Sequence, residues 1–141
     1  MTKLTLKLAK KLIEASERKA KDLGVAMVIT IVDEGGNLIA VHRMDDAWIA
    51  SIEIAQNKAW TSVALKMPTS NLASATIPNS ELYGLNTTNN GKIVVFGGGI
   101  PLVEDGKVVG AVGVSGSSVA NDTQVAEAAI LAFEKQELVN S

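Results

Sequence analysis

Residues 96–118 read FGGGIPLVEDGKVVGAVGVSGSS, and this stretch concentrates glycine, β-branched residues and a turn signal. Asp105-Gly106 stands between the aliphatic pairs at 102–103 and 108–109, which is the pattern of a β-hairpin with a two-residue turn. We therefore expect two antiparallel strands that meet at this turn, and we expect the rest of the chain to pack around them.

The glycines in this stretch predict close packing of the backbone. Gly97, Gly98 and Gly99 have no Cβ, so the chain there can adopt a positive φ or lie directly against another group, a ligand included. Gly110 and Gly113 interrupt the strand after the turn, where glycine indicates a bulge or a close backbone approach. The strand is therefore expected either to carry a bulge or to touch a neighbouring element at its backbone.

The composition of the chain excludes several kinds of binding partner and catalytic chemistry. The length of 141 residues suits one domain over residues 1–141. A net charge of −2 with 20% charged residues does not favour binding to a polyanion, so we expect no nucleic acid partner. The absence of cysteine excludes disulfides, thiolate catalysis and Cys-ligated metals. We find no signal sequence and no apolar run of about 18 residues, so we expect a cytoplasmic protein without a membrane span. The many small aliphatic residues leave apolar surface for subunit contacts.

The first part of the chain predicts a helix and a hairpin. Thr5 can cap an amphipathic helix that Gly24 ends. The run 25–32 is almost continuously apolar and β-branched, which favours a central strand covered on both faces. The loop 33–37 supplies glycine for a turn, and 38–44 returns as the second strand.

The remainder predicts two longer helices and three strands. A helix is expected over 47–67, capped by Asp45 or Asp46 and ended by Pro68. Residues 69–71 are expected to cap a short helix, and a polar loop at 86–91 resembles a mobile lid. Residues 93–96 are expected to resume β structure before the glycine-rich hairpin. Asp122 is expected to cap a closing helix with Val125, Ala129 and Phe133 on one side.

This order of elements favours an α+β fold. Strand groups joined by hairpins and separated by helices are typical of a largely antiparallel sheet. We predict about five strands in a profilin-like or PAS-like arrangement, with helices packed around the sheet.

The tetrapeptide His42-Arg43-Met44-Asp45 carries the most chemistry. On a strand, His42 and Met44 point to one face and Arg43 and Asp45 to the other. His42 could ligate a metal or haem iron with Met44 as a second candidate, or it could face solvent or another subunit on an edge strand. Arg43 could form a structural ion pair with Asp45 or Asp33, or it could bind a carboxylate.

Three further residues have two interpretations each. Lys58 lies in the long helix, either on a solvated surface or at a site, and Tyr83 offers a phenol that could ligate iron or simply pack. Ser115 lies in Gly113–Ser117, which resembles a nucleophile elbow but has serine where the final glycine is required. Ser115 is therefore read as a turn or pocket residue.

Five motifs in order along the chain resemble the GlcG/HbpS family, which includes the C-terminal domain of PduO-type proteins and the OrfY-type proteins of glycerol and diol utilisation. They are VDEGGN at 32–37, RMD at 43–45, SIEIAQNKAW at 51–60, FGGGIPL at 96–102 and GAVGVSG at 110–116, with Asp122 after them. The resemblance implies the profilin-like fold, homo-oligomers such as tetramers or octamers, and binding of a tetrapyrrole, haem or a corrinoid.

The family pattern implies a set of ligand-binding residues: Arg43, Asp45, Lys58, Gly97, Gly98, Gly99, Pro101 and Ser115. Our first hypothesis is a non-catalytic accessory protein for storage, transfer or sensing of haem or a corrinoid. Arg43 and Lys58 would meet propionates or amides, and His42, Tyr83 or Met44 would reach the metal. Alternatives are an enzyme acting on a small hydroxy acid or carbonyl compound, with Arg43 as carboxylate clamp and Asp45 or Lys58 as acid/base, and an assembly module without a ligand.

Overall fold

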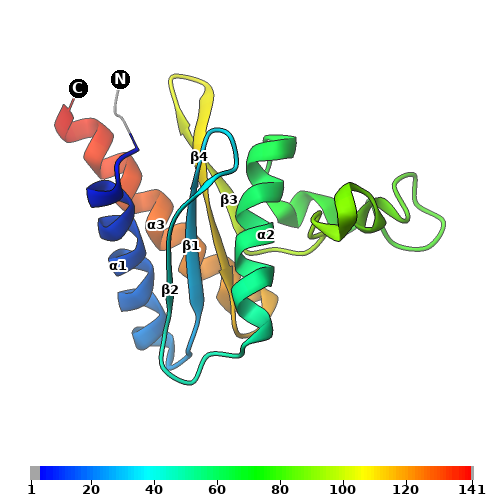
Figure 1. Cartoon of the computed structure of the whole chain (residues 1–141), viewed down its shortest axis with the longest axis horizontal. Helices are drawn as coiled ribbons and strands as arrows, with labels where there is room; N and C mark the ends of the chain where they lie inside the picture. Colours follow the sequence, from blue (N-terminus) through cyan, green and yellow to red (C-terminus); the bar gives the residue numbers. More distant parts are fainter. Residues whose placement is uncertain (1–3, 141) are drawn as a thin grey trace.

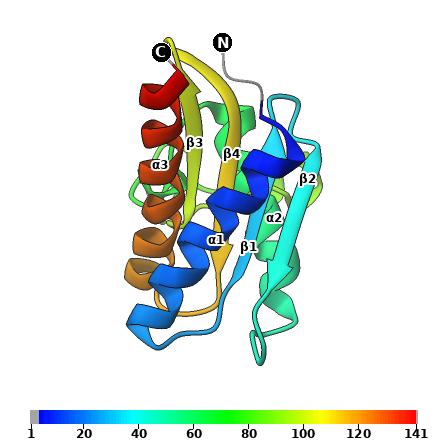
Figure 2. The ribbon, with the colours of Figure 1, turned by 90° about the vertical axis from the view of Figure 1, so that its left-hand side faces the viewer.

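A computed structural model describes residues 4–140 and has one antiparallel sheet between two layers of helices. Figure 1 shows α1 and α3 on one face of the sheet and α2 on the other, and Figure 2 shows α1 crossing the sheet beside α3. The strand order is β2-β1-β4-β3, with β1 (Val28–Asp33), β2 (Leu38–Arg43), β3 (Gly99–Glu104) and β4 (Lys107–Ser115). The α-helices are α1 (Leu6–Leu23), α2 (Ala50–Leu65) and α3 (Val119–Asn140), and the short 3₁₀ helices are η1 (Thr69–Leu72), η2 (Leu85–Thr87) and η3 (Asn89–Gly91).

The predicted hairpin is confirmed. β3 and β4 pair antiparallel, and Asp105 and Gly106 between them have φ values of 52° and 76°. Positive φ at both central residues defines the type I′ turn, whose twist matches that of the flanking strands. The strand β1 is central, as expected, because it pairs with β2 on one side and β4 on the other.

The main core lies between the sheet and the pair α1 and α3. Thr5 caps α1 by accepting a hydrogen bond from the N–H of Leu8, and Gly24 ends the helix with φ 72°, both as predicted. The predicted apolar side of α3 is also confirmed: Val125, Ala129 and Phe133 are buried against the sheet and α1.

The helix α2 packs on the other face through small residues. A Cβ built on Gly113 would meet the carbonyl oxygen of Ala55 and would lie 2.7 Å from the nitrogen of Ala59. The backbones of β4 and α2 therefore touch, and glycine in mid-strand is required by this approach. The predicted close contact is with α2.

Three sequence-based expectations about the elements are wrong. Residues 93–96 form no strand, so the described chain has four strands rather than about five; the N–H of Val94 donates to the Thr61 hydroxyl of α2, whose backbone cannot extend a sheet. The helix α2 begins at Ala50 without a side-chain cap, so neither Asp45 nor Asp46 caps it. α3 begins at Val119, before Asp122, and the Ser118 hydroxyl accepts from the N–H of Asn121.

The α+β class with a largely antiparallel sheet is confirmed, while the profilin-like or PAS-like arrangement stays a prediction. The segment between η1 and β3 extends away from the body of the molecule, as Figure 1 shows, and contains the expected polar loop as η2 and η3.

Replacing Gly113 by alanine should destabilise the fold by about 3 kcal/mol, because backbone atoms on both sides leave no room for a methyl group. The matched control is Gly24→Ala, where no atom lies within 4 Å and only the positive φ is strained, at a cost of about 1 kcal/mol. Urea unfolding of both variants measures the difference. Equal stability of Gly113→Ala and the wild type would contradict the close approach of α2.

Candidate functional site

The centre of the predicted site is a buried ion pair. Lys58 of α2 is fully buried, and its Nζ donates hydrogen bonds to Oδ2 of Asp122 at 3.0 Å and to the carbonyl oxygen of Val114 at 2.8 Å. The ring of Phe96 has its centroid 5.0 Å from the same nitrogen. The interpretation of Lys58 as a solvated surface residue is therefore wrong.

The pair joins three elements at one point. Lys58 lies in the middle of α2, Val114 near the end of β4 and Asp122 in the first turn of α3. The second oxygen of Asp122, Oδ1, accepts from the N–H of Ser117 at 3.0 Å. Asp122 therefore stabilises the start of α3 from inside the helix, not from the cap position, and neutralises Lys58 with its other oxygen.

Burial dominates the electrostatics of the pair. Removal from water lowers the pKa of Lys58, and the attraction and hydrogen bond of Asp122 act in the opposite direction. Burial likewise raises the pKa of Asp122, against the opposing effects of Lys58 and of the backbone at Ser117 and Gly116. A pair of this kind holds a definite geometry, but it adds little net stability because desolvation offsets the attraction.

The three consecutive glycines pass directly over this pair. A Cβ on Gly98, whose φ is 124°, would lie 2.6 Å from Nζ of Lys58, and a Cβ on Gly99 would lie 2.5 Å from the Lys58 carbonyl oxygen. A Cβ on Gly97 would lie 2.7 Å from the hydroxyl of Thr123. The group that requires glycine here is thus the protein itself: the FGGG segment closes over Lys58.

Ser115 and Pro101, two further predicted ligand-binding residues, are buried in the strands β4 and β3. Ser115, at the end of β4, is buried and donates a hydrogen bond from its hydroxyl to that of Ser51 on α2 at 3.1 Å. Pro101 is buried on the edge strand β3, paired in register with Ala111. Ser115 therefore links β4 to the first turn of α2, and Pro101 occupies an edge position where proline is tolerated.

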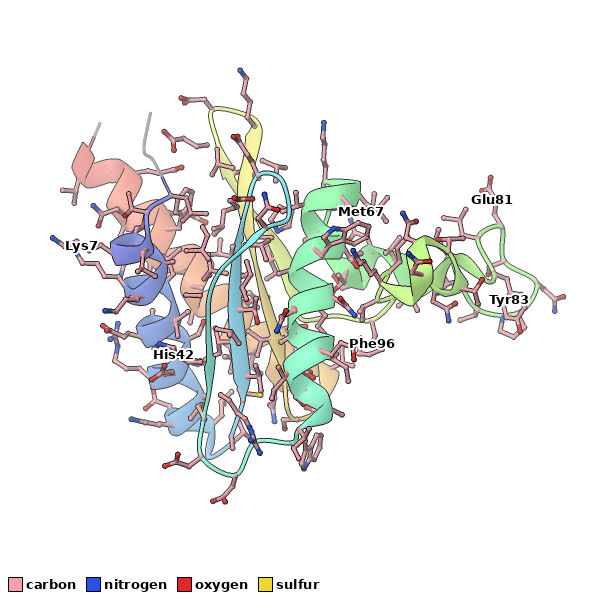
Figure 3. All side chains as sticks on the ribbon, in the orientation of Figure 1. Lys7, His42, Met67, Glu81, Tyr83 and Phe96 are labelled. Atoms are coloured by element: carbon pink, nitrogen blue, oxygen red, sulfur yellow. The ribbon has the colours of Figure 1, made fainter. Side chains whose placement is uncertain are left out.

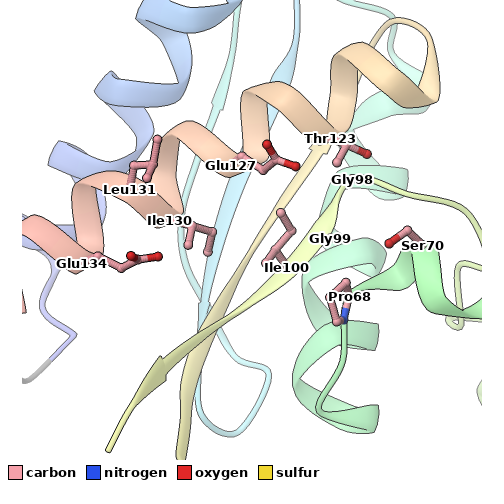
Figure 4. A pocket seen from close by; sticks show the side chains of 10 residues that line it. All are labelled: Pro68, Ser70, Gly98, Gly99, Ile100, Thr123, Glu127, Ile130, Leu131 and Glu134. Carbon is pink, nitrogen blue, oxygen red and sulfur yellow. The ribbon is translucent and has the colours of Figure 1, made fainter. Parts of the chain in front are cut away.

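A groove of about 410 Å³ opens between α3 and β3, next to these glycines. Figure 4 shows its lining, which is Pro68, Ser70, Gly98, Gly99, Ile100, Thr123, Glu127, Ile130, Leu131 and Glu134. Its walls are mainly apolar, and its polar groups are two hydroxyls and two carboxylates. Lys58 lies behind Gly98 and does not line the groove.

The structure places His42 away from this groove. Its Nδ1 lies 2.6 Å from Oε1 of Glu17 on α1, so His42 faces the helical layer opposite to α2. Met44 points the same way, as predicted, and its sulfur accepts from the N–H of Met27 at 3.4 Å. The groove adjoins the edge strand β3, whereas His42 lies on the other edge strand, β2.

The other candidates are also separate from the ion pair. Arg43 donates from Nε and Nη2 to the carbonyl oxygen of Ala47, and no ion pair with Asp45 or Asp33 is formed. Asp45 is exposed. Tyr83 is 66% exposed on the projecting segment, far from His42 and Phe96 in Figure 3. Among the residues 4–140, no three His, Asp or Glu side chains gather around a possible metal site.

The sequence did not predict two sets of residues: the partner of His42, and the carboxylates that line the groove. Glu17 lies 25 residues before His42, and only the crossing of α1 over the sheet brings the two together. Glu127 and Glu134 on α3 are spaced one heptad apart, so a helical wheel places them on one face, but nothing in the sequence pairs that face with β3.

A family model described as “Haem degrading protein HbpS-like” matches residues 4–131. The chain is 46% identical over 132 residues to the uncharacterized 15.0 kDa protein in the dhaT-dhaS intergenic region of Citrobacter freundii, covering 94% of this chain and 93% of that protein. It is 45% identical over 122 residues to the corrinoid adenosyltransferase PduO of Citrobacter freundii, a match that spans 86% of this chain and 36% of PduO.

Two crystal structures share the fold over almost the whole chain. The Klebsiella pneumoniae protein ORFY has a TM-score of 0.92 and 41% identity, covering 95% of this chain and 93% of that chain. The PduOC:heme complex has a TM-score of 0.89 and 40% identity, covering 93% of this chain and 95% of that chain. Within the described residues, no helix is long and apolar enough to cross a membrane.

Removing one partner of the ion pair should cost more than removing both. Lys58→Met leaves the Asp122 carboxylate buried without its cation, and the free energy of unfolding should fall by about 3–5 kcal/mol. The double variant Lys58→Met/Asp122→Asn should lose clearly less than the sum of the two single losses. Urea unfolding of all four proteins gives the coupling energy, and strictly additive losses would show that the two groups do not interact.

The lowered pKa of Lys58 predicts a stability that increases with pH. Between that lowered pKa and the ordinary value of 10.5, the unfolded chain holds a proton on Lys58 that the folded chain lacks, so the free energy of unfolding rises with pH in this window. Unfolding curves of the wild type and of Lys58→Met/Asp122→Asn, recorded at matched pH, measure the effect. The rise should be absent from the double variant, and parallel curves would refute it.

Proposed function

We propose that this chain, which belongs to the HbpS-like family of haem-degrading proteins, binds haem as a small-molecule-binding accessory protein. The sequence-based resemblance to the GlcG/HbpS family is thereby confirmed. The observation that carries the proposal is the fold shared with the PduOC:heme complex over almost the whole chain. Storage, transfer or sensing of the ligand in a catabolic context is part of the proposal.

The side chains that could ligate the iron of a porphyrin in this chain are one first candidate and two weaker ones. Among side chains that commonly ligate haem iron, the chain has one histidine and no cysteine. His42 has its Nδ1 held by Glu17, which leaves Nε2 for a metal. Met44 already accepts a hydrogen bond at its sulfur, and Tyr83 lies on the projecting segment. His42 is therefore our first candidate for the iron ligand, and Tyr83 and Met44 are weaker ones. Bound haem would supply an iron centre beside the imidazole.

The groove between α3 and β3 favours a ligand with hydrogen-bond donors over an anionic ligand. Its ionisable groups, Glu127 and Glu134, would repel the propionates of haem, but carboxylates accept hydrogen bonds from amides. A corrinoid carries amides around its ring, so the groove supports a corrinoid side chain as a second candidate ligand. Gly98, Gly99 and Ile100 would contact such a ligand from β3.

The arrangement gives less support to catalysis. The enzyme hypothesis requires Arg43 to clamp a carboxylate near Lys58 or Asp45, yet Lys58 is buried and engaged with Asp122, and no hydrogen bond or ion pair joins Arg43 to either residue in the described chain. We therefore propose a binding role for this chain.

Self-association is a further part of the proposal. Trp48 and Ile49, just before α2, are 64% and 75% exposed, and Phe96 and Val119 are also large exposed apolar residues. Uncovered apolar side chains of this size are typical of a surface that contacts another subunit. They support the expected homo-oligomer, a tetramer or an octamer.

Hemin titration of the purified chain should produce a saturable shift of the Soret band at near-stoichiometric concentration. Cobalamin and iron-free protoporphyrin IX are titrated in parallel, because they separate binding of a corrinoid or of the bare ring from ligation of the iron. If only cobalamin gave a saturable change, the ligand of this chain would be a corrinoid and not haem. Failure of both hemin and cobalamin to saturate would refute the proposed function.

A further inference from the structure

We propose that Glu17 and His42 form a ligating unit for haem iron, in which Glu17 orients the imidazole and Nε2 of His42 binds the metal. The inference rests on the proposed function and adds to it the residue that positions the iron ligand and the face of the molecule where the porphyrin lies.

The contact between the two side chains decides which ring nitrogen is left for a metal. Nδ1 of His42 lies 2.6 Å from Oε1 of Glu17, a short distance typical of a hydrogen bond to a charged acceptor. An ionised carboxylate only accepts, so the proton of a neutral ring stands on Nδ1. Nε2 then carries the lone pair, and Nε2 is the atom available to a metal.

The imidazole side chain of His42 is partly exposed to solvent. The side chain of His42 is 43% exposed and that of Glu17 is 25% exposed. Within residues 4–140, Nε2 of His42 makes no hydrogen bond. Metal-ligating histidines almost always donate their other ring N–H to a carboxylate, a carbonyl or water, which fixes the ring and strengthens it as a donor. The pair has this arrangement before any metal is bound.

The surroundings of the pair suit a porphyrin with two carboxylates. Lys10, Glu14 and Lys21 are exposed and lie on the same side of α1 as Glu17, so this side carries two lysines as well as carboxylates. The two lysines can meet propionates, and the lining of the α3 groove has no such basic side chain. Ala40 and Met44 are partly buried apolar residues next to His42 along the chain, and they pack on the same core as α1.

The α3 groove offers a matched control on the other side of the molecule. Glu17 and Glu127 are both carboxylates on helices. Glu17 contacts His42 on the edge strand β2, whereas Glu127 lines the groove beside the opposite edge strand, β3. A haem seated at His42 responds to substitution of Glu17 and not of Glu127. A haem seated in the groove shows the reverse dependence.

The test uses the full chain loaded with hemin, with absorption and resonance Raman spectra in the ferric and ferrous states. The wild type should show an iron–histidine stretch that His42→Ala lacks. Glu17→Gln should weaken hemin binding by about tenfold, lower the frequency of this stretch and raise the midpoint potential, because a neutral amide donates less charge to the ring. Glu127→Gln should leave all three quantities unchanged.

Added imidazole separates ligation from folding. His42→Gly should regain the wild-type spectrum when imidazole is supplied, which loss of structure alone does not allow, and circular dichroism checks that each variant is folded. An unchanged spectrum in His42→Ala would overturn the inference while haem binding stands. Wild-type behaviour of Glu17→Gln would remove the role of Glu17. No saturable binding of hemin to the wild type would refute the proposed function together with this inference.

Discussion

The buried pair of Lys58 and Asp122 is the constraint on which the FGGG segment and the start of α3 depend. A charge removed from water is tolerated only when an opposite charge and hydrogen bonds replace its solvent, and here Asp122 and the carbonyl of Val114 do so. The partners belong to α2, β4 and α3, so satisfying one ammonium group fixes three elements relative to each other. Gly98 follows from this geometry, because any side chain there would occupy the position of the lysine nitrogen, and Gly99 lies equally close to the carbonyl oxygen of Lys58.

The sheet separates two chemically different edges. At β3, the groove combines apolar walls with the carboxylates Glu127 and Glu134 and has no basic side chain in its lining. At β2, an imidazole held by a carboxylate lies beside a helix face that carries lysines. A ligand with carboxylates and a metal suits the second edge, and a ligand rich in amides or hydroxyls suits the first.

The sequence predicted those features that depend on local chemistry. The turn at Asp105-Gly106, the caps of α1 and the apolar side of α3 follow from φ preferences, orphan N–H groups and helical periodicity. Features that depend on distant partners could not be predicted. Residues 93–96 have β-branched composition, but their neighbour is Thr61 on a helix; the contact between Glu17 and His42 exists only because α1 crosses the sheet.

The pairing of β1 with β4 has a consequence for how the chain reaches this fold. β1 and β2 are adjacent in sequence and can form a hairpin by themselves, but the other edge of β1 finds its partner in register only at residues 110–115. Long-range pairing of this kind slows folding, because a large loop must close before the contacts form. During synthesis, this edge of β1 therefore stays unpaired until residues 110–115 have been made, and an unpaired strand edge favours aggregation.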